Sequence, residues 1–274
     1  ATACVAWVVS PVAAAPTLPD FSLATFVPGA AVDNPYFPLV PGTTRTYTAI
    51  VDGEEVILED TVTFETELVL GVQVVRVRAR EIIDGLLHED TIDKYAQDTA
   101  GNVWYFGEET TEFEYDDQGV KIGQSTAGSW KAGVNGASPG FIMPANLPNG
   151  FNYFQEFAPN DGAVDQATIL SSTESISIPV GDFDNVLKTL EFTELEPGKF
   201  EHKLYAPGVG LALIEEDLNE LGEPGVVIPL VSVTVIPLPP AALPALGGVL
   251  GVVAMTAPWR RVRDRRARQS RASA

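Results

Sequence analysis

Two Asp-Gly pairs, each placed between runs in which apolar and polar residues alternate, constrain the fold of this chain more than any other feature. The pairs are Asp52-Gly53 and Asp84-Gly85. Asp-Gly favours the two-residue turn of a β-hairpin, because both central residues of that turn need a positive φ. Further turn signals follow at Asp117-Gln118-Gly119, Asp161-Gly162 and Pro197-Gly198. The sequence is therefore typical of a series of hairpins.

The residues between these turns alternate with the period of a β-strand. Residues 61–65 and 75–80 alternate cleanly, and the second run places Arg76, Arg78 and Arg80 on one face. No amphipathic helix of three turns is evident between the two ends of the chain. We therefore predict a mainly β domain with antiparallel strands over residues 36–235.

A weak internal repeat indicates how these strands are organised. Tyr95-Ala96 and Tyr205-Ala206 lie 110 residues apart, and each pair is followed by a glycine and a further apolar strand. The repeat predicts two related β-meanders, about 36–125 and 140–218, which form one curved antiparallel sheet or half-barrel. Chance similarity between β-rich segments is the alternative explanation.

The C-terminal end of the chain has the sequence of a membrane span. The apolar run 241–259 would rise about 28 Å as a helix, close to the roughly 30 Å hydrocarbon core of a bilayer. Arginines beside a span favour the cytoplasmic side, so we expect the preceding domain to lie outside the cytoplasm. The arginines after the run are Arg260, Arg261, Arg263, Arg265, Arg266, Arg268 and Arg271, and the first five determine the expected topology.

A short proline motif precedes this run, and it consists of Ile236, Pro237, Leu238, Pro239 and Pro240. Together with the single span and the arginine cluster, it resembles the PEP-CTERM class of exosortase sorting signals of Gram-negative bacteria, in the Val-Pro-Leu-Pro-Ala variant. Ile236 and Pro240 differ from that variant, and no glutamate lies between Pro237 and Pro239.

This resemblance covers residues 236–274 and concerns sorting alone. It implies that an exosortase-type enzyme in the inner membrane cuts near the proline motif. The enzyme would then pass the domain to the cell surface or to an exopolysaccharide matrix. An ordinary C-terminal transmembrane anchor is the alternative.

The N-terminal residues agree with export. Residues 1–14 form an apolar stretch that ends in small residues, which is typical of a signal peptide cleaved after Ala14. The stretch has no basic start, so it is predicted to be an incomplete signal peptide, and residues 15–35 are predicted to be an extended segment. Lipidation at Cys4 is the alternative. Without residues 1–14 the chain has no cysteine, so its stability must come from its core.

The charge of the chain excludes one class of partner. The formal net charge is −20, from 17 basic and 37 acidic residues. Seven of the basic residues and one acid follow Trp259, so residues 1–258 carry 10 basic and 36 acidic residues, or −26. Such a domain repels phosphate backbones, so we expect no nucleic-acid partner.

Several segments of the domain also resemble an uncharacterised group of bacterial exported proteins and lipoproteins. These segments are residues 34–42, 95–108 and 205–210, in which a Tyr-Ala segment and a Gly-Val-Gly turn end a sheet. The resemblance covers most of residues 34–217. It implies a β-rich fold and export, and it carries over no activity.

Catalytic and metal-binding signatures are sparse. His88 and His202 are the two histidines, and no Ser or Cys nucleophile lies in a recognisable elbow. A metal site formed by both histidines is less favoured than two surface strand residues, so we predict no metal and no cofactor. The acids that recur in both halves are Glu108-Glu109 and Glu215-Glu216, which we nominate for a carboxylate mechanism. Adjacent carboxylates on a strand face opposite sides, so neither doublet alone is an acid/base pair.

Aromatic residues gather in the middle of the chain and favour a binding surface. A curved sheet that presented Trp104, Tyr105, Trp130 and Tyr153 on its concave face would bind a polysaccharide or an apolar ligand. Core packing is the alternative for most of these side chains. The glycine-rich stretch 128–140 contains Trp130 and has a length that suits a cover over that face.

Two functions follow for this chain. The preferred hypothesis is an exported, non-enzymatic protein, membrane-anchored or processed by an exosortase, that binds or organises material at the cell surface or in the extracellular matrix. During sorting it would contact the inner membrane through residues 241–259. The alternative is an exported hydrolase that acts on glycans through carboxylates.

Overall fold

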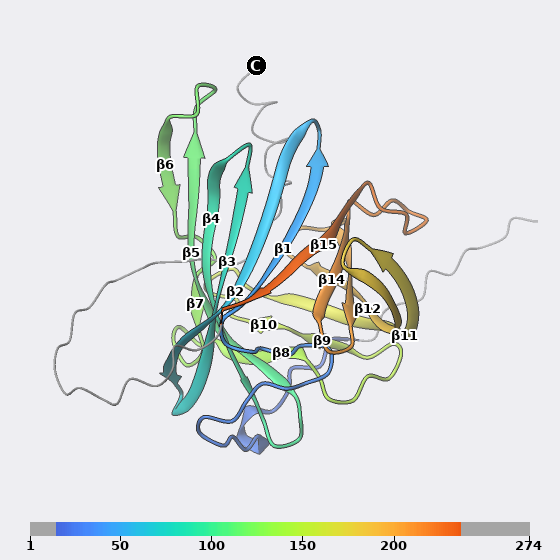
Figure 1. Cartoon of the computed structure of the whole chain (residues 1–274). Helices are drawn as coiled ribbons and strands as arrows, with labels where there is room; N and C mark the ends of the chain where they lie inside the picture. Colours follow the sequence, from blue (N-terminus) through green and yellow to red (C-terminus); the bar gives the residue numbers. More distant parts are fainter. Residues whose placement is uncertain (1–14, 237–274) are drawn as a thin grey trace, which may run out of the picture.

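The computed structural model describes residues 15–236, and almost all regular structure in that range is β (Figure 1). One 3-10 turn, η1 Phe21–Leu23, precedes the first strand. The prediction of a mainly β, antiparallel domain is confirmed. The strands are β1 Thr43–Val51, β2 Glu54–Val69, β3 Val72–Ile83, β4 Leu86–Gln97, β5 Val103–Tyr115, β6 Lys121–Ser125, β7 Trp130–Lys131, β8 Ser138–Met143, β9 Asn152–Phe154, β10 Glu156–Phe157, β11 Asp165–Ile178, β12 Gly181–Thr193, β13 Phe200–Ala206, β14 Gly210–Glu216 and β15 Val226–Val235.

These strands form one sheet that returns on itself. Its order is β10-β8-β5-β4-β3-β2-β1-β15-β14-β13-β12-β11-β9, and β6 and β7 also pair with β5. The two ends of this order belong to one segment, because Gln155 alone separates β9 from β10. β9 pairs with β11 and β10 pairs with β8, so the antiparallel sheet is nearly closed.

The sheet therefore closes further than the predicted half-barrel. A half-barrel would leave two edges with unpaired N–H and C=O groups. Residues 152–157 cover both edges, although the contact of β10 with β8 consists of two residue pairs, Glu156 with Pro139 and Phe157 with Ser138. Strands this short have no alternating run that a sequence pattern would detect.

Two four-stranded meanders, β2–β5 and β11–β14, lie on opposite sides of the β1–β15 pair in the sheet order. Tyr95 in β4 and Tyr205 in β13 lie in the third strand of each meander. The two meanders thus place the Tyr-Ala pairs at corresponding positions. The boundaries of the two halves stay a prediction.

The Asp-Gly pairs form the expected hairpin turns. Asp52-Gly53 has φ values of 54° and 91°, and Asp84-Gly85 has φ values of 48° and 78°, as a type I′ turn requires. A third turn of this kind joins β2 to β3 at Leu70-Gly71, with φ values of 52° and 80°. Leucine rarely adopts a positive φ, so no turn pattern predicted it.

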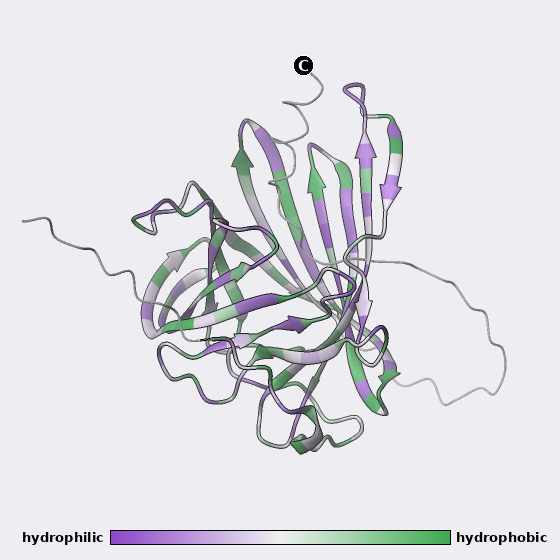
Figure 2. Cartoon of the chain, turned by 180° about the vertical axis from the view of Figure 1, so that it is seen from behind, coloured by the Kyte–Doolittle hydropathy of each residue, from purple (hydrophilic) through white to green (hydrophobic). Residues whose placement is uncertain are grey.

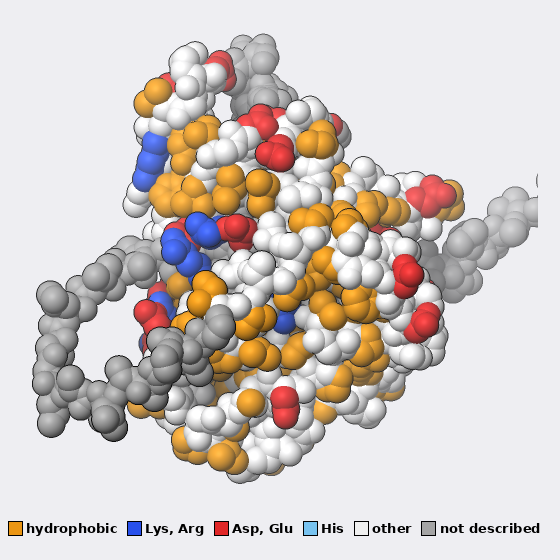
Figure 3. Space-filling model, in the orientation of Figure 1, with side chains coloured by type: hydrophobic (Ala, Val, Ile, Leu, Met, Phe, Trp, Pro, Cys, Tyr) orange, Lys and Arg blue, Asp and Glu red, His pale blue; other side chains and the backbone are white. Residues whose placement is uncertain are grey.

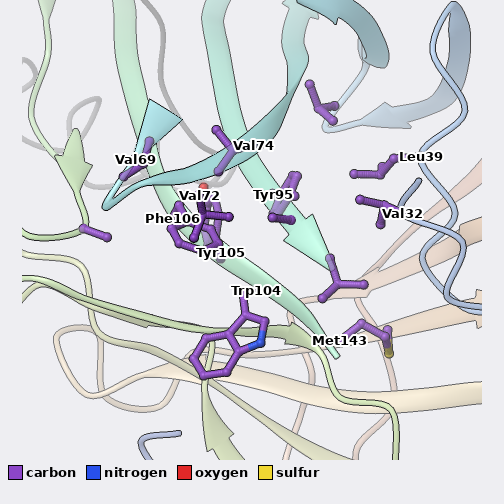
Figure 4. Close-up of a cluster of buried hydrophobic side chains, with 14 of the residues drawn as sticks. Val32, Leu39, Val69, Val72, Val74, Tyr95, Trp104, Tyr105, Phe106 and Met143 are labelled. Atoms are coloured by element: carbon purple, nitrogen blue, oxygen red, sulfur yellow. The ribbon is translucent and has the colours of Figure 1, made fainter. Parts of the chain in front are cut away.

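The segment before β1 covers one side of β5. Phe21 and Phe26 lie close to Trp104 and Phe106, with ring centroids 5.7–6.2 Å apart. Phe21 belongs to η1, whose first turn is capped by the Asp20 carboxylate. Trp104 and Phe106 therefore lie in the largest cluster of buried apolar side chains, part of which is drawn in Figure 4.

Apolar and polar residues alternate along the strands (Figure 2), and the arginines of β3 are paired on the polar side. On the face shown in Figure 3, several Lys and Arg side chains lie near one another at the left and others lie singly, whereas Asp and Glu side chains are spread over the surface. The β3 arginines form ion pairs with acids on neighbouring strands: Arg76 with Glu65, Arg78 with Asp90, and Arg80 with Glu59. Partly exposed ion pairs of this kind contribute about 0–1 kcal/mol each to stability.

Several predicted features lie outside the described residues. They are the signal peptide 1–14, the motif residues Pro237, Leu238, Pro239 and Pro240, the span 241–259, and the arginines from Arg260 onward. Within residues 15–236, no helix is long and apolar enough to cross a membrane.

Candidate functional site

Charged side chains converge inside the nearly closed sheet. A cavity of about 80 Å³ is lined by six carboxyl groups and one ammonium group. Burying charge is costly unless the charge is paired or neutralised by a proton. The acids are Asp93, Glu108, Glu156, Asp165, Glu191 and Glu201, and the base is Lys203.

β4 and β5 bring two of these acids together. In their antiparallel register Asp93 pairs with Glu108 and Tyr95 pairs with Tyr105, and all four side chains line the cavity. Oη of Tyr105 lies 2.5 Å from Oδ1 of Asp93 and 2.6 Å from Oε2 of Glu108. A tyrosine hydroxyl has one proton to donate, so the second short contact requires a proton on one of the carboxyls.

Burial keeps these two carboxyls in their neutral form. It raises the pKa of Asp93 to about 8, although the hydrogen bond from Tyr105 acts in the opposite direction. Burial and then the charge of Glu156 raise the pKa of Glu108 well above its usual value. At neutral pH this part of the cavity therefore holds protons rather than negative charges.

In the other meander, β11–β14, the acid Glu191 forms an ion pair with Lys203. Nζ of Lys203 lies 2.7 Å from Oε2 of Glu191 and 3.5 Å from Oε1 of Glu201. Tyr205 donates its hydroxyl proton to Oε1 of Glu191 at 3.0 Å, and Thr189 donates to the same oxygen at 2.9 Å. An ammonium group and two hydroxyl groups thus bind the Glu191 carboxyl group.

The segment that closes the sheet contributes an unpaired amide. Gln155 lines the cavity and is 4% exposed. Among the described residues, its Nε2 is one of the buried side-chain nitrogens without a hydrogen-bond partner. An unmet buried donor costs about 1–3 kcal/mol, so a molecule that accepts this hydrogen bond would be stabilised here.

The four aromatic residues proposed as ligand contacts are all buried. Trp104, Tyr105, Trp130 and Tyr153 have exposed fractions of 0–3%. Trp104 faces Phe21 and Phe26, and Trp130 packs edge-on against Tyr105 with ring centroids 5.4 Å apart. Of the four, Tyr105 lines the cavity. All four side chains are thus packed in the core and are not displayed on an open concave face.

The nominated acid doublets separate to opposite faces, as neighbours on a strand do. Glu108 lines the cavity, whereas Oε1 of Glu109 lies 2.9 Å from Nζ of Lys94. In the other doublet, Oε2 of Glu215 lies 2.9 Å from Nδ1 of His202. Glu108, Glu109 and Glu215 thus have different partners, and the two members of the first doublet lie on different faces of the sheet.

The two histidines lie on strands that are far apart in the sheet order. His88 in β4 packs against Tyr115 with ring centroids 5.1 Å apart, and His202 in β13 contacts Glu215. Within residues 15–236, no group of three or more His, Cys, Asp or Glu side chains has the geometry to hold a metal ion.

Sequence patterns did not identify Asp93, Gln155 or Lys203 as members of an interior cluster. A usable signal existed for Asp93, because it lies two residues before Tyr95 and therefore shares the face of that buried ring. The same spacing relates Lys203 to Tyr205. Gln155 offered no such signal, because it lies between strands of three and two residues.

The folding stability should depend on pH through Asp93. Its pKa is about 8 in the folded chain and 3.8 in the reference state, so the folded chain holds a proton that the unfolded chain releases. The stability from this group is therefore full in acid and is lost as the pH rises from about 4 to about 8. We expect Tm to fall by several degrees between pH 6 and pH 9, and to fall less in Asp93→Asn. Thermal unfolding followed by circular dichroism measures both falls, and equal falls would contradict the assignment.

Comparison with known proteins gives little further information. No family model matches the sequence, and no curated protein is significantly similar to it. Among solved structures, it is similar to a candidate lipoprotein from Parabacteroides distasonis, with a TM-score of 0.39 and 14% identity over 73% of this chain and 98% of that chain. A candidate exported protein with a YmcC-like fold from Bacteroides fragilis gives a TM-score of 0.32 and 17% identity, with the same coverage. At these scores neither similarity supports a conclusion about function.

Proposed function

We propose that this chain is an exported protein of the bacterial envelope that acts without enzymatic chemistry. Residues 1–14 direct it across the inner membrane, and residues 241–259 hold it there. An exosortase-type enzyme then cuts within residues 236–240 and passes the domain to the cell surface or the extracellular matrix. There the β domain binds or organises extracellular material such as a polysaccharide.

The observation that supports this proposal most directly is that the last strand of the sheet ends immediately before the proposed sorting motif. β15 ends at Val235, and the next residue, Ile236, is the first residue of the proposed sorting motif. Ile236 is 64% exposed, and its N–H donates to the carbonyl oxygen of Gly42 at 2.9 Å. The motif thus begins at the residue after the last strand, and that residue is exposed, so we infer that cleavage within the motif does not require the sheet to open.

The small interior supports the non-enzymatic part of the proposal. The cavity measures about 80 Å³, whereas pockets for small molecules usually measure about 300–1,000 Å³. In this cavity the Asp93 and Glu108 carboxyl groups both contact the Tyr105 hydroxyl, which lies between them. A glycan chain has no room beside this pair, so we favour a binding role of the outer surface over a carboxylate hydrolase.

Cell fractionation tests the sorting step. The full chain would be expressed in a Gram-negative host that contains an exosortase, and the mass and location of the product would be determined. We expect a shortened product at the surface or in the matrix. Replacing Pro237 and Pro239 together by alanine should reduce the shortened product at least about tenfold and leave the full-length chain in the membrane.

Pro207→Ala is the matched control, because Pro207 lies in a turn of the β domain outside the motif. It should be processed as the wild type is. A wild-type chain that stays at full length in the membrane would contradict sorting and favour an ordinary anchor. A cytoplasmic product would contradict export itself.

A further inference from the structure

The two meanders differ at one corresponding interior position. Lys203 follows Asp93 by 110 residues, and each lies two residues before the tyrosine of its Tyr-Ala pair. In the second meander, the Lys203 ammonium lies 2.7 Å from Glu191 and 3.5 Å from Glu201. In the first meander, the same position carries the carboxyl group of Asp93. One half of the cavity thus contains its own ammonium group, and the other half contains an additional acid.

We propose that the cavity binds a small primary ammonium ion that also carries a hydroxyl group, of the size of protonated ethanolamine. The ammonium group of this ligand lies beside Asp93 and Glu108, as the Lys203 ammonium lies beside Glu191. The hydroxyl oxygen of the ligand accepts a hydrogen bond from Nε2 of Gln155. This inference goes beyond the envelope role and does not depend on it.

The mostly acidic lining of the cavity favours a ligand that carries a positive charge. Six carboxyl groups and one ammonium group line the cavity, and Asp93 and Glu108 are 3% and 1% exposed. Hydrogen bonds between an ammonium ion and a carboxylate are roughly twice as strong as neutral ones, and they are strongest away from water. A bound ammonium ion would therefore replace one of the protons that neutralise these two carboxyls.

Gln155 indicates that the ligand carries a hydrogen-bond acceptor. This indication is independent of the acidic lining. Its amide nitrogen is a donor that has no hydrogen-bond partner among the described residues, and the residue as a whole is 4% exposed. An ammonium ion has no lone pair with which to accept this bond. The ligand must therefore bring an acceptor as well, and a hydroxyl group is the smallest one.

The volume limits the size of the ligand. A cavity of about 150 Å³ holds one benzene molecule, which has six non-hydrogen atoms, so about 80 Å³ leaves room for roughly three to four. A bare metal ion fits less well, because no group of three or more acidic, His or Cys side chains within residues 15–236 has metal-binding geometry. Ethanolamine has four non-hydrogen atoms and meets both requirements.

Binding should release a proton. Burial raises the pKa of Asp93 to about 8, so below that pH the carboxyl must lose its proton before it can bind the cation. If one proton is displaced, affinity rises about tenfold per pH unit up to about pH 8. The other titratable groups around Asp93 are Tyr105 and Glu108 on β5, Asp60 on β2, Lys94 and Tyr95 on β4, Glu156 on β10, Asp165 on β11, Glu191 on β12, and Glu201 and Lys203 on β13.

Isothermal titration calorimetry on the full chain in a mild detergent tests the proposal, with ethanolamine as the probe and ethylene glycol as its neutral analogue. A ligand of four atoms reaches a dissociation constant of about 40 µM at best. We expect ethanolamine to bind in the micromolar to millimolar range, about tenfold tighter at pH 8 than at pH 7. Ethylene glycol should not bind. Equal binding of both compounds, or binding of neither, would overturn the proposal.

Variants locate the site. Asp93→Asn and Glu108→Gln should each weaken ethanolamine binding at least about tenfold, while Glu109→Gln, the neighbour on the opposite face, should change it less than about twofold. Gln155→Met should weaken ethanolamine binding several-fold and leave the binding of ethylammonium, which lacks the hydroxyl, unchanged. Circular dichroism confirms that each variant is folded. An equal loss in Glu109→Gln, or no loss in both Asp93→Asn and Glu108→Gln, would exclude this cavity as the site.

Discussion

Replacing Gly140 by alanine is expected to destabilise the protein by about 3 kcal/mol or more and to lower Tm by roughly 6–12 °C. A Cβ atom on Gly140 would lie 2.4 Å from the carbonyl oxygen of Phe154 and 2.5 Å from that of Gln155. Both are backbone atoms of the segment that closes the sheet, so they cannot move aside as a flexible side chain would. The substitution therefore forces β8 away from residues 152–157 and opens the closure. Chemical denaturation of both proteins measures the difference.

Gly123→Ala is the matched control for this substitution. Gly123 lies in a strand, as Gly140 does, and the nearest atom to its added Cβ would be Oε2 of Glu114, at 2.9 Å. That atom is the far end of a flexible, partly solvated side chain, so we expect a change within about 0.5 kcal/mol. A Gly140→Ala protein as stable as Gly123→Ala would mean that the closure between β8 and β10 contributes little to the fold.

Replacing Lys94 by alanine is the second substitution with a large expected effect, a loss of about 2–4 kcal/mol in the free energy of unfolding, most of it from lost packing. The Lys94 side chain is fully buried, and its Nζ lies 2.9 Å from Oε1 of Glu109 and 3.7 Å from Oε2 of Glu67. Alanine would remove the cation that both partly buried carboxylates share and would leave a gap in the packing. Urea denaturation at neutral pH measures the loss.

Lys121→Ala is the control for the change in charge. Lys121 is exposed, and its Nζ lies 4.4 Å from the centre of the Phe113 ring. Such an exposed contact contributes about 0.5–1 kcal/mol, so the variant should remain within about 1 kcal/mol of the wild type. If both lysine variants lost the same amount, the burial of Lys94 would have no special role in stability.

The hairpins could be predicted because their chemistry is local. Asp52-Gly53 and Asp84-Gly85 adopt the positive φ values that their residue types favour, and the strand before the first pair alternates over most of its length. Leu70-Gly71 makes the same turn although leucine does not favour a positive φ. The long pairing of β2 with β3, which this turn joins, stabilises it. Tertiary pairing thus overrode a weak local preference.

The interior cluster could be predicted only in part. Alternation along β4 indicates that Asp93 shares a face with Tyr95, and the repeat relates both to Lys203 and Tyr205. Whether that face is buried depends on the opposite meander and on the closing segment, which a strand pattern does not describe. For the same reason the mid-chain aromatic residues were consistent with both a binding face and a core.

The sequence by itself determined the antiparallel β class, the positions of the two Asp-Gly turns and the acidic character of the domain, because each depends on neighbouring residues or on composition alone. It also carries the predictions of export and sorting, since residues 1–14 and 237–274 lie outside the described structure. The tertiary structure alone decided that the sheet closes through Gln155 and that Asp93, Glu108 and Lys203 line one cavity. These contacts join residues far apart in the chain, and their stability comes from burial and pairing that no local pattern encodes.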